Sequence, residues 1–318
     1  MVKFKHLLFS ASSAMAIAML AGAPIQEARA ADIAQVCQPL AGTVTAGYIF
    51  GDLNIEANIT ADDDDDDDDD FDESFDFGTF FGEGEVLYHF CNTNLNVQGD
   101  FAFHSHQFDV DAPFDLANDR WHVGGILFWR DQDVGVLGLD ASFLNDDFFG
   151  KNSETWRVGL RGEFFAGDMF TLGAGAGYLD GEFFGKNWDG FDVNAWARIY
   201  PTENIGLLAR FDYATQDVDS FDIDHWAVGG EGEFILPNLP MSIFAGARYG
   251  ESNFDVNGKG FEFSTEVTEI YAGVSIYFGS DGNGGSLASH HRNNTLDNTS
   301  VIFERLPNFF AGKVAIAP

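Results

Sequence analysis

The stretch that decides the fold is Thr155–Tyr178, which reads TWRVGLRGEFFAGDMFTLGAGAGY. Its first half places Trp156 and Leu160 on one face of an extended chain and Arg157 and Arg161 on the other, and its second half alternates apolar residues with glycine. Because successive side chains leave opposite sides of a β-strand, this alternation predicts two strands joined by a short turn, an antiparallel hairpin. One face is apolar and the other carries charges and glycines, as in a membrane barrel with lipid outside and water inside.

The same alternation recurs from residue 43 to residue 279. Tight turns alternate along this region with longer stretches rich in Asp, Glu and Phe, such as NDDFFGKNSE at residues 145–154. We therefore predict an all-β fold, an antiparallel transmembrane β-barrel of about 12 strands with short periplasmic turns and long acidic extracellular loops. A water-soluble barrel would have the reverse pattern, with an apolar interior and a polar exterior.

Composition agrees with strands and limits the partners. The chain has 318 residues, with 34 Phe and 36 Gly but only 8 Pro, which favours strands over helices. Its formal net charge of −35 argues against binding to nucleic acid or to anionic lipid surfaces. Divalent cations are the partners that such a charge favours.

The N-terminus has the features of an export signal. Lys3 and Lys5 precede an apolar run from Leu7 to Leu20, and Ala28-Arg29-Ala30 forms a cleavage site. We predict a signal peptide over residues 1–30 and a periplasmic leader over residues 31–42. After residue 30 no segment approaches the roughly 18 consecutive apolar residues of a membrane helix, so any insertion must use strands.

The two cysteines are predicted to form one disulfide. Cys37 and Cys91 are an even pair in an exported chain, and the exported compartment is oxidising. The predicted topology places Cys37 just before the first strand and Cys91 in the first periplasmic turn. Both sulfurs then lie at the same end of neighbouring strands, where a disulfide would hold the leader.

The last predicted strand carries a resemblance to a known family. Residues 269–278 read EIYAGVSIYF, and the spacing of Tyr271, Gly273, Ile276 and Phe278 is similar to the closing β-signal of outer-membrane proteins. With the signal peptide and the strand pattern, residues 43–279 resemble the porin-like outer-membrane β-barrel proteins of Gram-negative bacteria. The resemblance implies location in the cell outer membrane, contact with its lipid, and recognition by the barrel-assembly machinery.

The chain departs from that family by continuing past its final aromatic residue. The tail, residues 280–318, begins with a composition typical of flexible linkers. We predict a flexible periplasmic tail, with docking on a partner or entry into the barrel as a plug as alternatives.

The inner faces of the predicted strands carry the available chemistry. The predicted lumen-lining charges are Asp100, Arg157, Arg161, Glu163, Asp192, Arg198, Arg210, Asp212, Glu231, Glu233, Arg248 and Glu269. These charges can line a narrow passive pore for small polar solutes or ions. Alternatively they pair across the lumen into a salt-bridged, non-conducting barrel with a structural or adhesive role. Gly173, Gly175 and Gly177 are interpreted as free space beside the arginines, which favours the pore.

An enzyme is not expected. The twelve-stranded phospholipases need a His-Ser pair on the lipid face, and the histidines here lack such a serine; no G-x-S-x-G or H-E-x-x-H motif occurs. His104 and His106 could suggest a metal, but we expect them to be solvated.

The acidic segments are the remaining candidates for binding. Asp62–Asp70 is an unbroken run of nine aspartates, which we interpret as a solvated loop because like charges repel and extend. Ordered calcium sites space their carboxylates with glycine turns, and this run does not. We predict no cofactor and no dedicated metal site, with weak divalent cations shared between loop carboxylates and lipopolysaccharide.

Overall fold

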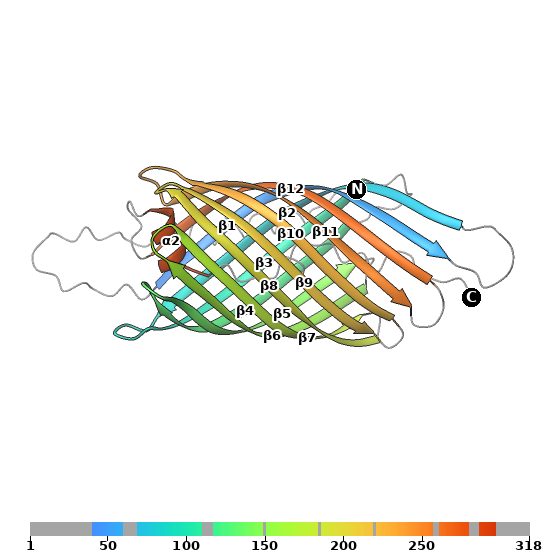
Figure 1. Ribbon diagram of the computed structural model, residues 1–318, viewed down its shortest axis with the longest axis horizontal. Helices are drawn as coiled ribbons and strands as arrows, with labels where there is room; N and C mark the ends of the chain where they lie inside the picture. Colours follow the sequence, from blue (N-terminus) through green and yellow to red (C-terminus); the bar gives the residue numbers. More distant parts are fainter. Residues whose placement is uncertain are drawn as a thin grey trace, which may run out of the picture. The chain divides into compact units, whose positions relative to one another are not determined.

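The computed structural model describes residues 40–59, 69–109, 117–148, 151–183, 186–218, 221–256, 261–279 and 286–296, all within one compact unit, Gln38–Pro318. These residues form twelve strands and one short helix, labelled as in Figure 1: β1 (Leu40–Ile59), β2 (Asp69–His89), β3 (Leu95–Asp109), β4 (Ala117–Asp131), β5 (Gly135–Phe148), β6 (Lys151–Ala166), β7 (Phe170–Phe183), β8 (Lys186–Thr202), β9 (Ile205–Val218), β10 (Phe221–Ile235), β11 (Met241–Val256), β12 (Phe261–Phe278) and α2 (Leu287–Asn293).

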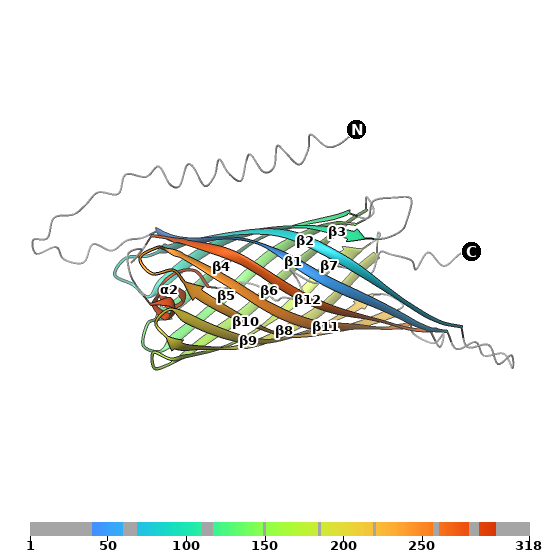
Figure 2. The same ribbon diagram turned by 90° about the horizontal axis from the view of Figure 1, so that it is seen from above.

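The strands close into a barrel. Each strand pairs antiparallel with the next in sequence, and β1 pairs with β12 to close the ring (Figures 1 and 2). The closing register runs from Gly42 opposite Phe278 to Ile59 opposite Phe261. Closure leaves no edge strand with unpaired backbone groups, which is the condition for crossing a membrane with strands. The prediction of a closed, antiparallel barrel of twelve strands is confirmed.

Five connections at one end of the barrel are short. They occupy residues 90–94, 132–134, 167–169, 203–204 and 236–240, and α2 lies at this same end (Figure 1). Three of them use a left-handed residue, namely Asn92 (φ 64°), Gly167 (φ 60°) and Asn238 (φ 63°). Glycine and asparagine tolerate this conformation, so the chain reverses without steric cost. We call this end of the barrel the turn end.

At the opposite end the strands run further than the sequence pattern predicted. The segment 145–154 was expected to be a loop, yet β5 continues to Phe148 and β6 starts at Lys151. The strands are 14 to 21 residues long, whereas about 9–11 tilted residues suffice to cross a bilayer. Beyond the bilayer a strand needs no apolar outer face, so apolar alternation is lost there although backbone pairing continues. Of the aspartate run, Asp69 and Asp70 begin β2, and the rest lies outside the described residues.

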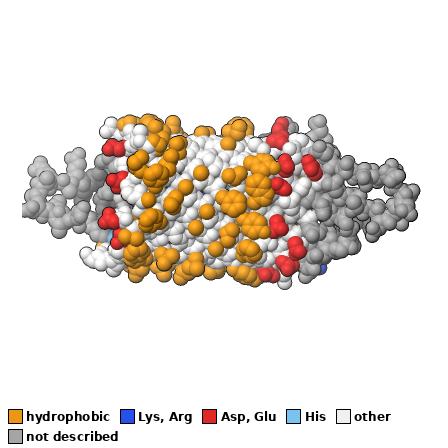
Figure 3. Space-filling model, in the orientation of Figure 1, with side chains coloured by type: hydrophobic (Ala, Val, Ile, Leu, Met, Phe, Trp, Pro, Cys, Tyr) orange, Lys and Arg blue, Asp and Glu red, His pale blue; other side chains and the backbone are white. Residues whose placement is uncertain are grey.

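The outer face of the barrel is apolar. Phe50, Leu137, Val158 and Ile270 each have more than 60 % of their surface exposed, at 67, 63, 62 and 64 %. Figure 3 shows hydrophobic side chains around the middle of the barrel, with acidic side chains toward both ends. A soluble protein would bury this much apolar surface, so the belt marks the part of the wall that faces lipid.

Aromatic side chains form a girdle on this outer face. They pair with neighbours on adjacent strands, with ring centroids separated by 5.3 Å for Trp121–Phe143, 4.6 Å for Phe143–Trp156, 6.2 Å for Phe191–Tyr213 and 5.4 Å for Trp226–Tyr249. Amphipathic rings at this position suit the boundary between hydrocarbon and lipid headgroups. The girdle and the belt identify the fold as a transmembrane β-barrel.

Several predicted segments fall outside the described residues. These are the signal peptide over residues 1–30, most of the leader, and the tail at residues 280–285 and 297–318. Among the residues that the structure describes, no helix is long and apolar enough to cross a membrane.

Candidate functional site: the barrel lumen

The charged side chains on the inner wall pair with one another along the wall. Arg157 on β6 is the clearest example: it forms an ion pair with Asp140 on β5 and a second with Asp192 on β8, where Nε lies 2.8 Å from Oδ1. All three side chains are buried. One guanidinium with a planar fork of donors can serve two carboxylates at once, so the three groups form a fixed, nearly dry cluster.

The glycines of β7 make this cluster possible. β7 lies between β6 and β8, so Arg157 must pass over β7 to reach Asp192. A Cβ at Gly177 would lie 2.7 Å from Arg157 Cζ, and a Cβ at Gly175 would lie 2.9 Å from Asn194 Oδ1. At Gly173 the Trp196 ring occupies the space, and the Arg161 guanidinium lies 4.6 Å from that ring's centroid.

The interpretation of these glycines as free space beside the arginines is therefore wrong. The space that glycine leaves on β7 is filled by long side chains reaching over from β6 and β8. The sequence shows that β7 has no side chains at these three positions, but it does not show which neighbouring side chains cover the glycines.

Other ion pairs also join residues on the same or adjacent strands. Arg120 on β4 lies 2.8 Å from Asp146 on β5, and Arg248 on β11 pairs with Glu269 on β12. Arg210 contacts Asp212 two residues along β9, at 3.1 Å. In the described part of the chain, these pairs follow the wall instead of bridging the lumen, so they do not by themselves fill it.

The structure divides the predicted lumen-lining charges into two groups. All of them lie on the inner face of their strands, and none is exposed on the lipid side. The first group packs in the wall and does not line the main lumenal cavity: Asp100, Arg157, Arg161, Asp192 and Glu269. The second group lines it: Glu163, Arg198, Arg210, Asp212, Glu231, Glu233 and Arg248.

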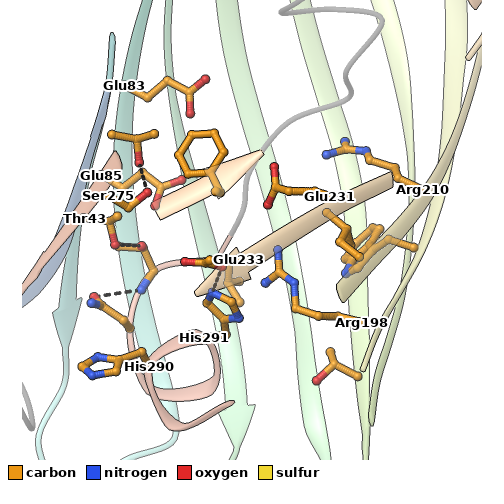
Figure 4. Close-up of a pocket in the computed structure, with 18 of the residues that line it drawn as sticks. Thr43, Glu83, Glu85, Arg198, Arg210, Glu231, Glu233, Ser275, His290 and His291 are labelled. Carbon is orange, nitrogen blue, oxygen red and sulfur yellow. Dashed lines mark hydrogen bonds and ion pairs between the residues drawn. The ribbon is translucent and has the colours of Figure 1, made fainter. Parts of the chain in front are cut away.

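That cavity has a volume of ≈ 130 Å³ and is lined by charges of both signs. Glu83 and Glu85 project from β2 on one side, while Arg198 on β8 and Arg210 on β9 project from the other (Figure 4). Glu231 on β10 lies on the same side as the arginines. Sequence reasoning missed Glu83 and Glu85, although strict alternation from the outward-facing Val86 and Tyr88 would have placed them inward.

The floor of the cavity is formed by the C-terminal tail. His290, His291 and Arg292 of α2 line the cavity, as do Asn294, Thr295 and Leu296. Leu287 and Leu296 are fully buried, at 0 and 1 % exposure. The prediction of a flexible periplasmic tail is therefore wrong for residues 286–296, which lie in the barrel mouth, as the alternative of entry into the barrel predicts. The sequence contains a signal for this helix, because Ser286 is a residue that favours the N-cap position. In the structure its hydroxyl accepts a hydrogen bond from the Ser289 amide.

Apolar side chains pack against one another inside the barrel next to the cavity. Inward-facing residues of nine strands form one buried cluster: Ile49, Leu53, Phe77, Phe81, Leu144, Leu179, Trp188, Ala214, Ile223, Ala227, Phe244, Phe254, Val267 and Tyr271. Two of them, Phe244 and Tyr271, also line the cavity. Phe81 and Phe244 stand on strands separated by β1 and β12, yet their ring centroids are 6.4 Å apart. The charged cavity is thus bordered both by the tail and by this apolar cluster.

The inner-wall histidines are buried, contrary to the expectation that they are solvated. His106 is 0 % exposed and its Nδ1 lies 2.6 Å from the Thr79 hydroxyl, while His104 stacks on Phe81. His122 Nδ1 lies 3.4 Å from an Asp100 carboxylate oxygen. Within the described ranges, no group of three or more His, Cys, Asp or Glu side chains is arranged to hold a metal ion.

The remaining predicted site residues lie at the turn end and on β12. Cys91 lies in the turn between β2 and β3, whereas Cys37 is outside the described residues, so their disulfide stays a prediction. In the β-signal, Tyr271 faces the lumen and Ile276 faces outward. Phe278 covers Gly42 of β1, where a Cβ would collide with its ring. Recognition by the assembly machinery also stays a prediction.

Comparison with known proteins gives a shared fold. No protein-family model matches the sequence, and no curated protein matches it. Among solved structures, an outer-membrane channel from Pseudomonas putida F1 is similar over 79 % of this chain and 100 % of that chain, with a TM-score of 0.50 and 9 % identity.

Two further solved structures are similar at 10 % identity. A Pseudomonas aeruginosa FadL homologue covers 75 % of this chain and 90 % of its own, with a TM-score of 0.40. The translocator domain of the autotransporter NalP from Neisseria meningitidis covers 86 % of this chain and 96 % of its own, with a TM-score of 0.41. The likeness to the outer-membrane channel shows a shared barrel fold. The apolar belt and the aromatic girdle place this barrel in a membrane, in contact with its lipid.

Proposed function

We propose that the chain is a narrow outer-membrane channel for small polar solutes or ions, with its turn end occupied by its own C-terminal tail. The observation that carries the proposal is the charged cavity inside the barrel, which is lined by both carboxylates and guanidinium groups. Charged groups inside a low-dielectric barrel are costly to bury without water or partners. A lumen that keeps them around a cavity suits polar cargo better than a sealed apolar core does.

The number of strands and the volume of the cavity support a narrow pore. Twelve strands lie between barrels of about eight strands, filled by side chains, and porins of 16 or more, which hold an open channel. The cavity of ≈ 130 Å³ has room for several waters or one small solute. The carboxylates and guanidinium groups that line the cavity would interact with a polar solute and filter ions during passage.

A second candidate is a non-conducting structural barrel. Its supporting observations are that residues 286–296 line one side of the cavity and that apolar side chains around Phe81 and Phe244 pack together inside the barrel. In this second proposal the barrel has a structural or adhesive role. Its acidic segments would share divalent cations with lipopolysaccharide. No enzymatic role is proposed.

Single-channel recording in planar bilayers separates the two candidates. We expect the refolded full chain to show rare, small conductance steps and a variant lacking residues 280–318 to show larger, more frequent ones. Heat-modifiable migration on SDS gels serves as the control that both barrels are folded. Two folded but silent barrels would reject the channel and leave the structural role.

A further inference from the structure

The tail segment Ser286–Leu296 is held by specific contacts on opposite sides of the barrel mouth. At its start, the Leu287 amide donates to the carbonyl of Glu203 in the turn between β8 and β9, at 2.7 Å. At its end, Leu296 contacts Gln98 on β3. Between these points Thr295 bonds to Thr43 on β1, with 2.8 Å between the hydroxyl oxygens. The segment therefore crosses the mouth instead of lying along one wall.

Two side chains in the middle of the segment fit sites with several partners each. His291 lies between Glu233, with Nε2 2.9 Å from Oε2, and Tyr200, with Nδ1 3.1 Å from the hydroxyl (Figure 4 shows the first contact). Arg292 donates to the Phe170 carbonyl at 2.7 Å, and its guanidinium lies 4.8 Å from the Phe165 ring centroid. Charged hydrogen bonds of this kind select for the side chain that makes them.

The end of the segment is recognised through its main chain. The Gln98 carboxamide donates from Nε2 to the Leu296 carbonyl at 2.8 Å and accepts from the Leu296 amide at 2.7 Å. This pair of bonds reproduces what a neighbouring strand would offer to an extended peptide. The Leu296 side chain packs in an apolar pocket with Ile126, Phe128 and Phe165.

The Glu233 carboxylate keeps hydrogen bonds from the wall without the segment. Glu233, the partner of His291, also accepts hydrogen bonds from Ser242 and from Tyr277. Departure of the tail would therefore leave this carboxylate with two donors from β11 and β12. A buried carboxylate that loses all of its hydrogen-bond partners destabilises the fold, but Glu233 would keep two of its partners.

We propose that the turn-end mouth is a peptide-binding site whose ligand is the chain's own segment 286–296, and that this segment is a removable plug. The plug would regulate the channel proposed above, and only that regulatory consequence rests on the proposed function. The connection from Gly279 to Ser286 contains six residues and reaches at most about 25 Å. A short connection of this kind gives an effective concentration on the order of millimolar, so even a modest affinity keeps the mouth occupied.

The test uses the full chain, with a protease recognition sequence in place of residues 280–285. The protein is folded intact and then cut, and the released fragment is washed away under mild urea. A fluorescently labelled peptide of residues 286–296 is added to the cut barrel, and its anisotropy is measured. We expect saturable binding with a Kd between about micromolar and millimolar.

Peptide variants test the recognition. An Arg292→Ala peptide is expected to bind at least about tenfold more weakly, because it loses charged hydrogen bonds. A Ser289→Ala peptide is the matched control and is expected to bind within about twofold, because the Ser289 hydroxyl accepts from Asn293 of the same segment. On the barrel side, Gln98→Leu is expected to weaken binding of the unaltered peptide while the barrel stays heat-modifiable.

The outcomes separate the plug from the channel. A fragment that cannot be washed from the folded, cut barrel would overturn the proposal, as would a scrambled peptide that binds as tightly as the native one. Conductance is recorded on the same samples, where addition of the native peptide is expected to reduce the steps. Specific binding to a barrel that never conducts would reject the channel and leave the peptide site standing.

Discussion

Replacing Gly177 by alanine is expected to destabilise the barrel by about 3 kcal/mol. A Cβ at this position would lie 2.6 Å from Asp192 Oδ1 and 2.7 Å from Arg157 Cζ, so the methyl group displaces the ion pair that crosses β7. Separating a buried pair costs about 3–5 kcal/mol because an uncompensated charge remains. We take the lower value because Arg157 keeps its contact with Asp140.

The measurement is urea unfolding of the barrel refolded into lipid vesicles, followed by tryptophan fluorescence. A loss of about 3 kcal/mol lowers the folding equilibrium constant roughly 100-fold. Gly162→Ala is the matched control in the same hairpin. Its Cβ would be 3.6 Å from the nearest atom, the Val136 carbonyl oxygen, so we expect a change within about 0.5 kcal/mol.

A double-mutant cycle tests the proposed cause. If the methyl group acts by displacing Asp192, then Asp192→Asn costs less in the Gly177→Ala background than in the native chain, with a coupling of about 1–3 kcal/mol. Additive effects, or equal stability of the Gly177 and Gly162 variants, would refute the explanation of the β7 glycines.

Three further predictions concern the belt, the cavity and the cysteines. Leu160→Arg places a charge midway along the exposed face of β6 and is expected to cost about 2–4 kcal/mol in the same unfolding assay; an unchanged stability would contradict the lipid-facing belt. Arg198→Glu reverses a cavity-lining charge and is expected to shift reversal potentials toward cation selectivity in the variant lacking residues 280–318, and an unchanged potential would exclude Arg198 from the conduction path. For Cys37 and Cys91, alkylation of the denatured, unreduced chain is expected to add no label, and labelling of both thiols would exclude the disulfide.

The barrel itself could be predicted from the sequence because its physical requirement is local. Every membrane-facing strand must present apolar side chains at each second position, so Trp156, Val158 and Leu160 reveal the outer face without knowledge of any partner. Strand ends were less predictable, since the segments near Phe148 and Lys151 lie beyond the apolar belt and carry no such requirement. Inner-face charges such as Arg198 could be assigned to the lumen, but not to a cavity or to the wall.

Sequence alone thus determined the strand periodicity, the closed antiparallel fold and the inward direction of the charges. Tertiary structure alone decided what fills the lumen. Arg157 reaches Asp192 only because β7 lies between their strands and carries glycine, and residues 286–296 bind the mouth only because closure brings Gln98, Thr43 and Glu233 around it. These contacts join residues that are far apart in the chain, so a local sequence pattern cannot predict them.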